Sequence, residues 1–451
     1  MLLFIEIEIA KRELFPKIFL SRALLGICSK IIISHRKYLK ELIESNKIEN
    51  AVLLIKDANP RSDLLEYYRN LKRKGFTIIS QDEEAGYIEQ NYENFSLNRH
   101  GEGETFDIVD FFLCWGKRDK EFLSNRFNKK KCEFINCGSP RLDIYKKDFN
   151  IGKNYLKVNK LNKNFILISL NFFCFYSRSF SERISLDAAR LGTKYRKTIG
   201  GINYEEHFFK REAETLYLLY EFINLVRFLA KKLPDKIIVL RPHPNFMVNR
   251  FQEITKDFPR NVKIISNGHL SEVIKNCEVV IQNSCSSAPE AVLANKKIVN
   301  YLGGQKFFQT DFVDSLGQNC SNQNEVLDAI NKLNIEDGDL GKLDERINFK
   351  GLSITTIINI LKSIEKENNK IKSINFKNNL SIKKLLKNKI KKIIGKNTQL
   401  SSGTNYVKLK LNEFDNDRIK QMVEEINNLD NQLFEKKINY NFFEEKFIVI
   451  N

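Results

Sequence analysis

The chain has 451 residues, of which 42% are apolar and 29% charged, and this balance is typical of a globular protein with two or three domains. It excludes collagen-like, coiled-coil-array and disordered chains, and the apolar runs are far shorter than the ~20 residues of a membrane-spanning helix. The net charge of +18 indicates either an anionic partner or simply a composition rich in Lys, Asn and Ile.

Residues 1–150 alternate predicted strands with helices, which predicts a Rossmann-like domain with a parallel sheet. The predicted strands cover 2–10, 30–34, 51–55, 76–80, 108–114 and 132–136, and helices are predicted at 14–29 and 63–74. We expect this domain to form the acceptor side of the protein. The polar residues 150–164 are predicted to be a linker.

Residues 165–347 repeat this alternation and predict a second Rossmann-like domain. Its predicted strands are 165–170, 236–240, 262–265, 279–281 and 297–301, with helices at 214–232 and 288–294. Ligands of parallel sheets bind at the carboxyl ends of the strands. Two such domains in tandem therefore predict a cleft between the carboxyl edges of their sheets.

Residues 348–451 are predicted to form a basic, helical C-terminal extension. The segment that runs from Lys370 to Lys396 carries ten lysines and no acid, with apolar residues at helical spacing. This pattern is typical of an amphipathic helix on a membrane surface, and a domain-packing helix is the alternative. The expected location is cytoplasmic and peripheral, at the inner face of the cytoplasmic membrane. No pattern places residues 397–451.

The eight cysteines form no C-x-x-C pair and only five histidines are present, so the sequence predicts no metal site and no bound cofactor. Several cysteines lie in apolar stretches, which indicates a reducing, cytoplasmic compartment. The N-terminus has acids at Glu6 and Glu8 and no basic region before its apolar stretch. It is predicted to be a first strand and not a signal peptide.

The motif Arg241-Pro242-His243-Pro244 follows a predicted strand. Because proline fixes φ, the turn is rigid and is expected to direct Arg241 and His243 from the sheet edge towards the cleft. Such a pair suits a phosphate or a leaving nucleotide. A rigid turn with an exposed histidine is the structural alternative.

A serine-rich turn leads from the strand at 279–281 into a helix and contains Asn283, Ser284, Ser286 and Ser287. Hydroxyl groups and free backbone N–H groups at a helix N-terminus can bind an anion, and Glu290 in the first turn can accept hydrogen bonds from a sugar hydroxyl. Simple helix capping by serine is the alternative. The turn lacks a P-loop pattern, so ATP hydrolysis is not supported.

An acidic loop of Asp82, Glu83 and Glu84 follows the strand predicted at 76–80. Adjacent acids repel one another, so at least one pKa is expected to rise, which favours a general base. A solvated acidic loop is the alternative, and no D-x-D pattern supports a divalent ion. Other polar residues also follow predicted strands and are expected on the acceptor side of the cleft: Arg12, Glu13, Lys117, Arg141 and Asn171.

Taken in order, the segments KREL, DEEAG, WGK, GSPRLD, SLNF, RPHP and NSCSSAPE resemble a family of bacterial surface-carbohydrate biosynthesis proteins. That family is similar to GT-B glycosyltransferases, including capsule Kdo transferases and bacterial sialyltransferases with His-Pro motifs. The resemblance covers residues 1–302. It departs from the acid-acid-Gly motif of the sialyltransferases because Ala85 separates the acids from Gly86.

The resemblance implies a GT-B-like fold and a metal-independent glycosyltransferase of lipopolysaccharide or capsule biosynthesis. The implied donor is a CMP-activated keto-sugar acid, and the implied acceptor is a lipid-linked glycan. His243 would contact the donor phosphate and help the nucleotide leave, and Glu290 would bind the ribose. The remaining implied roles are phosphate binding by Ser284, Ser286 and Ser287, deprotonation of the acceptor by Asp82 or Glu83, and acceptor contact by Arg12 and Arg141.

Four other functions are compatible with parts of the sequence. A glycerol- or ribitol-phosphate transferase that uses a CDP-alcohol shares the architecture and the His-Pro usage, and a UDP-sugar epimerase shares the fold. A non-catalytic scaffold of polysaccharide assembly is a further alternative. Nucleic-acid binding fits the charge, but the lysine cluster lacks interleaved aromatic residues and no recognised motif is present, so no nucleic-acid partner is expected.

Overall fold

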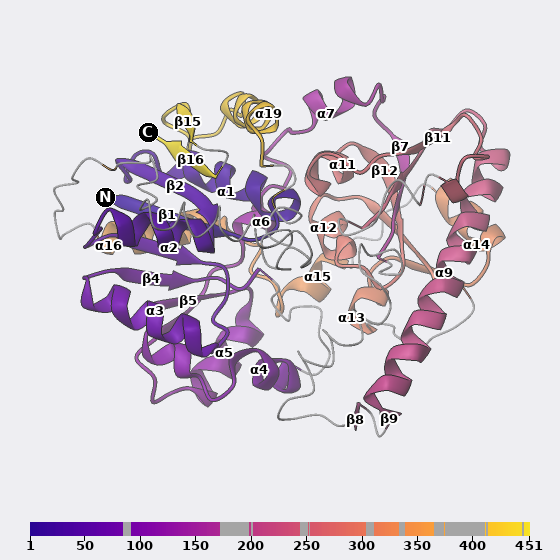
Figure 1. Ribbon diagram of the computed structural model, residues 1–451. Helices are drawn as coiled ribbons and strands as arrows, with labels where there is room; N and C mark the ends of the chain where they lie inside the picture. Colours follow the sequence, from indigo (N-terminus) through magenta and orange to yellow (C-terminus); the bar gives the residue numbers. More distant parts are fainter. Residues whose placement is uncertain are drawn as a thin grey trace, which may run out of the picture. The chain divides into compact units, whose positions relative to one another are not determined.

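The computed structural model describes residues 1–83, 92–171, 198–199, 202–243, 251, 253–303, 311–332, 339–364, 374, 411, 414–443 and 446–451. The chain divides into two compact units (Figure 1). The first combines Met1–Ile151 with Leu343–Asn451, and the second is Gly152–Lys342.

The first unit is built on an eight-stranded sheet with the strand order β15-β16-β2-β1-β3-β4-β5-β6. Six strands run parallel, and β15 and β16 form an antiparallel hairpin that pairs with β2. The central strands are almost wholly apolar because helices cover both faces of the sheet. The bounds are β1 (Leu2–Ile7), β2 (Lys30–His35), β3 (Val52–Ile55), β4 (Thr77–Ser80), β5 (Phe111–Cys114), β6 (Glu133–Asn136), β15 (Tyr440–Phe443) and β16 (Phe447–Ile450).

Successive side chains of β1 enter two different cores, because side chains alternate between the faces of a strand. Leu3 and Ile5 pack with α1, α16 and α19, whereas Leu2 and Phe4 pack with α2 and α3. The helices and helical turn of this unit are α1 (Ala10–Leu24), α2 (Arg36–Ser45), α3 (Ser62–Arg73), α4 (Tyr92–His100), η2 (Glu104–Asp107), α5 (Lys117–Arg126), α6 (Pro140–Asp143), α16 (Ser353–Ile364) and α19 (Asn416–Asn427).

The end of the chain belongs to the first unit, whereas sequence analysis treated residues 348–451 as an extension of its own. The apolar face of α19 packs on α1, and all four residues of β16 are buried in the sheet. Arg22 of α1 joins these parts, because its guanidinium donates to the backbone oxygens of Ile426, Leu429 and Lys436. The first sheet is therefore completed by residues some 400 positions away in the chain.

The second unit contains a six-stranded parallel sheet with the order β11-β10-β7-β12-β13-β14. Numbered from β7, this is the 3-2-1-4-5-6 order of the Rossmann fold. The strands are β7 (Phe165–Ser169), β10 (Ile238–Arg241), β11 (Val262–Ile264), β12 (Cys277–Gln282), β13 (Lys297–Tyr301) and β14 (Gln318–Cys320), with a separate pair β8 (Thr198–Ile199) and β9 (Ile202–Asn203). The helices are α7 (Lys153–Val158), α9 (Tyr204–Lys232), α11 (Leu270–Ile274), α12 (Ser287–Leu293), α13 (Asp311–Asp314), α14 (Gln323–Asn331) and α15 (Asp339–Leu343).

The two parallel α/β sheets confirm the GT-B-like fold class expected from the sequence. In detail the predicted linker at 150–164 contains the helix α7, and the last described elements include a β-hairpin as well as helices. Within the described part of the chain, no helix combines the length and apolarity needed to cross a membrane. The basic segment from Lys370 to Lys396 lies outside the described residues except for Ile374.

Candidate functional site

Three of the segments singled out in the sequence meet at the carboxyl edge of the first sheet. The side chain of Gln81 donates to the backbone oxygen of Gly138 at 2.8 Å, and the indole of Trp115 donates to that of Asp82 at 2.7 Å. Arg141 donates to the backbone oxygen of Glu83 at 3.3 Å. The acidic loop, the WGK segment and the GSPRLD segment are thus tied together, as parallel topology requires of residues that follow β4, β5 and β6.

Asp82 is held by an arginine that sequence analysis missed. The Nε and Nη2 atoms of Arg99, on α4, donate to the two carboxylate oxygens of Asp82 at 2.6 Å each. Asp82 itself is buried. A bidentate pair of this kind occupies both carboxylate oxygens. An acceptor hydroxyl could therefore reach Asp82 only by displacing Arg99.

Glu83 forms a buried ion pair with Lys17 of α1, with 2.5 Å between the carboxylate oxygen and the ammonium nitrogen. Both side chains are only 3% exposed. Burial alone would raise the pKa of Glu83, but the charges of Lys17, Arg141 and Arg12 outweigh it and the pKa lies below its ordinary value. Glu83 is therefore not the acid whose pKa rises, and because Glu84 lies outside the described residues, the expected rise within the loop stays a prediction.

Glu13, in the first turn of α1, is a carboxyl group with the properties of a base, and burial also raises the pKa of Asp119, on α5, to about 7. Burial, opposed by the adjacent Arg12 and reinforced by the negative charge of Glu83, raises the pKa of Glu13 to about 7. Its Oε2 accepts the backbone N–H of Glu8 at 2.6 Å, and its Oε1 accepts Nη2 of Arg12 at 2.8 Å. A carboxyl that titrates near neutral pH can both accept and release a proton under working conditions.

Sequence analysis placed Glu13 on the acceptor side but did not distinguish it from the neighbouring residues. The sequence shows that Glu13 and Lys17 are four residues apart, a spacing that places both on one face of a helix. Which acid Lys17 pairs with depends on α1 packing beside the β4 loop, which no local pattern reveals. The other predicted acceptor-side residues of this unit differ in exposure: Lys117 is exposed, Arg12 is half-buried and Arg141 is buried near the Trp115 ring.

In the second unit, predicted residues meet where the strand order reverses between β7 and β12, the point at which doubly wound sheets bind ligands. Asn171, just after β7, donates from Nδ2 to the backbone oxygen of Ser284, just after β12, at 3.2 Å. Ser284 has a left-handed φ of 42°. A non-glycine residue in that region stores backbone strain, which is common at ligand sites.

Several side chains at this edge have structural partners instead of the ligand-facing roles expected of them. The hydroxyl of Ser284 donates to both carboxylate oxygens of Asp314 at 3.0 Å, and Asn283 donates to the backbone oxygen of Tyr301 at 2.8 Å. Arg241 is buried, and its guanidinium donates to the backbone oxygens of the loop at 267–268 at 2.7 and 2.5 Å. Arg241 thus holds that loop, and its expected contact with a donor stays a prediction.

The other predicted donor-binding residues of this unit differ in burial. His243 follows β10 by two residues and is half-buried, and Ser286 is half-buried at the start of α12. Ser287 and Glu290 are buried on α12. Cys285 lies in the same turn, where burial raises the pKa of its thiol and hydrogen bonds with Ser287 and Ser169 oppose that rise.

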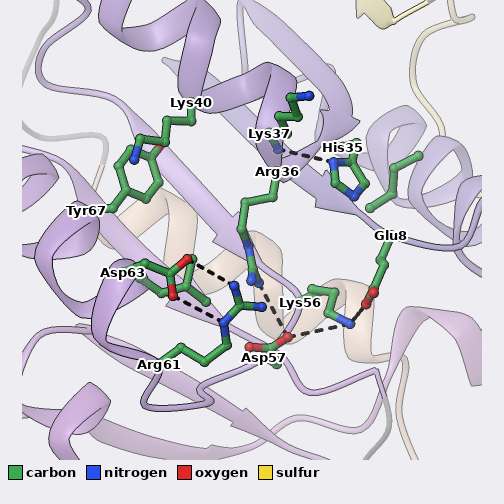
Figure 2. Close-up of a pocket in the computed structure, with 12 residues that line it drawn as sticks. Glu8, His35, Arg36, Lys37, Lys40, Lys56, Asp57, Arg61, Asp63 and Tyr67 are labelled. Carbon is green, nitrogen blue, oxygen red and sulfur yellow. Dashed lines mark hydrogen bonds and ion pairs between the residues drawn. The ribbon is translucent and has the colours of Figure 1, made fainter. Parts of the chain in front are cut away.

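A cavity of about 370 Å³ opens at the carboxyl edge of the first sheet, around the ends of β1, β2 and β3 (Figure 2). It had no counterpart in the sequence analysis. Its lining residues are Ile7, Glu8, His35, Arg36, Lys37, Lys40, Lys56, Asp57, Arg61, Asp63, Leu64 and Tyr67. Among the described residues, no group of three or more His, Cys, Asp or Glu side chains is arranged to hold a metal ion.

No protein-family model matches the chain, and no curated protein matches it. Among solved structures, it is similar to the Staphylococcus aureus MnaA–UDP complex, with 15% identity, a TM-score of 0.45 and coverage of 83% of this chain and 99% of that one. It is also similar to a UDP-GlcNAc 2-epimerase from Methanocaldococcus jannaschii bound to UDP-GlcNAc and UDP, with 14% identity, a TM-score of 0.46 and coverage of 80% and 100%. A third similar structure is the wall teichoic acid polymerase TagF carrying H548A, with 14% identity, a TM-score of 0.41 and coverage of 70% of this chain and 74% of that one. The fold assignment rests on the two sheets of this chain.

Proposed function

We propose that the protein is a glycosyltransferase of bacterial surface-glycan synthesis that binds a nucleotide-sugar donor on its second unit and an acceptor on its first. The observation that carries the proposal is the 3-2-1-4-5-6 order of the second sheet, with Asn171 and Ser284 joined at its switch point. This is the position at which sheets of that order bind nucleotides. The half-buried His243 follows a neighbouring strand of the same edge and is the proposed contact to the donor phosphate.

Glu13 is the proposed general base, in place of the acidic loop. All three acids pair with a cation, Asp82 with Arg99, Glu83 with Lys17 and Glu13 with Arg12, but burial raises the pKa of Glu13 to about 7. Arg12 covers Oε1 of Glu13 and is itself 24% exposed, so it is the side chain that an incoming acceptor would displace. In the proposed step the acceptor hydroxyl gives its proton to Glu13 and its oxygen bonds to the anomeric carbon, while the nucleotide leaves with the electron pair of the broken bond.

The proposed identities of the donor and the acceptor follow the family resemblance. The proposed donor is a CMP-activated keto-sugar acid and the proposed acceptor a lipid-linked glycan at the inner face of the membrane. A CMP donor carries a single phosphate, which cationic and hydroxyl groups of a protein can neutralise without a divalent ion.

The donor assignment is tested by calorimetric titration of CMP, CDP, UDP and GDP into the full chain, without added metal. We expect CMP to bind most tightly and His243→Ala to weaken it about tenfold or more, since a hydrogen bond to a charged group contributes about 1.5–3 kcal/mol. Arg227→Ala is the matched control, because Arg227 is a partly exposed cation on α9 that pairs with Asp257. Preferential binding of UDP would move the donor to the UDP-sugars, and absence of all nucleotide binding would overturn the proposal.

The transfer step is tested with the nucleotide sugar that binds and a glycan acceptor. We expect a product with a new glycosidic bond, and we expect Glu13→Gln to lower kcat by at least a hundredfold while nucleotide affinity stays unchanged. A phosphodiester product would instead identify an alcohol-phosphate transferase. Turnover of the nucleotide sugar without an acceptor would identify an epimerase.

A further inference from the structure

The cavity at the ends of β1, β2 and β3 lies where a ligand is expected in a sheet of this topology. The parallel strands of the first unit have the order 2-1-3-4-5-6, which reverses direction between β1 and β3. Sheets of this order bind ligands at that switch point. The cavity is lined there by Glu8 after β1 and by Lys56 and Asp57 after β3. Its volume of about 370 Å³ is near the lower end of the range for small-molecule sites, about 300–1,000 Å³.

The lining of the cavity is positively charged. Five cationic side chains face three carboxylates. Three of the cations are paired at short range: Lys56 with Glu8, Arg61 with Asp63 at 3.0 Å, and Arg36 with the buried Glu6 at 2.9 Å. The charges of Arg36 and Lys37 add to the effect of burial and lower the pKa of His35 to about 4. The histidine is therefore neutral at physiological pH, so it does not add to the positive charge of the lining.

Arg36 is one of the residues that line the cavity (Figure 2), and two carboxylates hold it there. Its Nε donates to the buried Glu6 at 2.9 Å, and its Nη2 lies 3.4 Å from a carboxylate oxygen of Asp57. Ion pairs of this kind hold the guanidinium in one orientation without filling all five of its donors. Arg36 is thus a pre-positioned donor for an anion that enters the cavity.

The two cations that the protein leaves least neutralised are Lys37 and Lys40. In the described part of the chain Lys37 has no acid within ion-pair distance, and the carboxylate nearest to Lys40 is that of Glu44, 4.0 Å away. Lys40 lies over the ring of Tyr67, with 5.0 Å from its nitrogen to the ring centre. Both lysines are in the first turns of α2, whose ten residues direct a positive dipole end to the same place.

The remaining wall of the cavity is apolar. Ile7, Leu64 and Tyr67 supply apolar atoms to the lining, and the ammonium group of Lys40 lies over the Tyr67 ring. The carbon face of a sugar ring can pack against apolar atoms, whereas a free inorganic ion cannot. The lining residues carry an excess of two positive charges, which the buried Glu6 beside Arg36 reduces, and a phosphate monoester carries about −1.5 to −2 at neutral pH.

We propose that this cavity binds a phosphate monoester carried on a sugar, as part of a phosphorylated glycan acceptor. The assignment of that sugar to the acceptor rests on the proposed function; the binding of a sugar phosphate does not. The cavity and the proposed base are directly connected, because the backbone N–H of Glu8 donates to Glu13 while the carboxylate of Glu8 pairs with Lys56. A phosphate held here keeps its sugar near Glu13, where the proton must be removed.

The experiment measures binding of glucose 6-phosphate, glucose, inorganic phosphate and CMP to the full chain, and of phosphatidylglycerol vesicles in a separate arm. The test variant is Lys37→Gln with Lys40→Gln, which removes two exposed charges. The matched control is Lys129→Gln with Lys131→Gln, two exposed lysines that precede β6 and so lie at the opposite, amino edge of the same sheet.

We expect glucose 6-phosphate to bind at least tenfold more tightly than glucose or inorganic phosphate. The Lys37/Lys40 variant should weaken it about tenfold or more, while the Lys129/Lys131 variant and CMP affinity stay unchanged. Equal weakening in both variants, or absent binding to wild type, would overturn the proposal. If the Lys37/Lys40 variant lost CMP binding, the cavity would be assigned to the donor. If it lost only vesicle binding, the cavity would be assigned to lipid headgroups. Either result would also overturn the proposal.

The same titrations separate this proposal from the proposed function. If glucose 6-phosphate binds as expected and no nucleotide binds at all, the sugar-phosphate site stands and the glycosyltransferase assignment fails. If nucleotides bind and glucose 6-phosphate does not, the glycosyltransferase assignment stands and this site fails.

Discussion

Replacing Glu13 with glutamine tests the electrostatic argument at the centre of the first unit. Burial raises the pKa of this carboxyl from its ordinary value of 4.5 to about 7 in the folded protein. The folded state therefore binds this proton more tightly than the unfolded chain does. The resulting stabilisation is fully present below about pH 4.5 and is lost as the pH rises through 7.

The size of the effect follows from the shift. One pKa unit corresponds to about 1.36 kcal/mol, so this single carboxyl should lower the free energy of unfolding by about 2.5 kcal/mol between pH 5 and pH 8. Glutamine does not ionise, and its side-chain oxygen can still accept the N–H of Glu8 that Glu13 accepts at 2.6 Å. The Glu13→Gln protein should therefore lack this part of the pH dependence.

The assay is urea unfolding of the full chain at pH 5, 6, 7 and 8, for wild type, Glu13→Gln and Glu66→Gln. Glu66 is an exposed carboxylate on α3 and serves as the control. We expect the stability of Glu13→Gln relative to wild type to increase by about 2.5 kcal/mol from pH 5 to pH 8, with no such trend in the control. A difference that stays constant across this range would show that Glu13 ionises normally, and its proposed role as base would lose its physical basis.

Three further substitutions test the packing that supports the sites. Lys17→Met should destabilise the chain by about 3–5 kcal/mol at pH 7, because Glu83 is left as a buried charge without its 2.5 Å partner, and most of the loss should disappear when urea unfolding is repeated near pH 4. Arg22→Met should lower the free energy of unfolding by about 2–4 kcal/mol, because three backbone oxygens lose a charged donor. It should also make the C-terminal segment the first site of limited proteolysis. Loss of stability without earlier cleavage in that segment would contradict this prediction. Gly317→Ala should lower the free energy of unfolding by at least about 2 kcal/mol, because the φ of Gly317 is 81° and a Cβ would lie 2.5 Å from the backbone oxygen of Ile298. Thermal unfolding measures the effect, and an unchanged melting temperature would refute that geometry.

The relation between sequence and fold is clearest in the two sheets. The apolar runs of β1, β2, β3, β7 and β12 were visible in the sequence because strands buried on both faces have few polar positions. Alternation with helices was enough to predict parallel sheets. The sequence could not show that the hairpin β15–β16 completes the first sheet, because strand pairing over some 400 residues depends on tertiary contacts with β2 and α1.

For the candidate sites, the sequence predicted where the residues lie but not their chemistry. Residues that follow parallel strands must gather at one edge, so the sequence by itself determined that the KREL, acidic-loop, WGK and GSPRLD segments meet, and the hydrogen bonds of Gln81, Trp115 and Arg141 are consistent with this. Their chemistry was decided only by the tertiary structure, because a pKa depends on burial and on charges brought from other elements. Arg99 from α4 and Lys17 from α1 pair with the acids that the sequence favoured, whereas burial raises the pKa values of Glu13 and Asp119 to about 7. The cationic cavity has the same origin, since its lining comes from three separate strand ends and the helices that follow two of them.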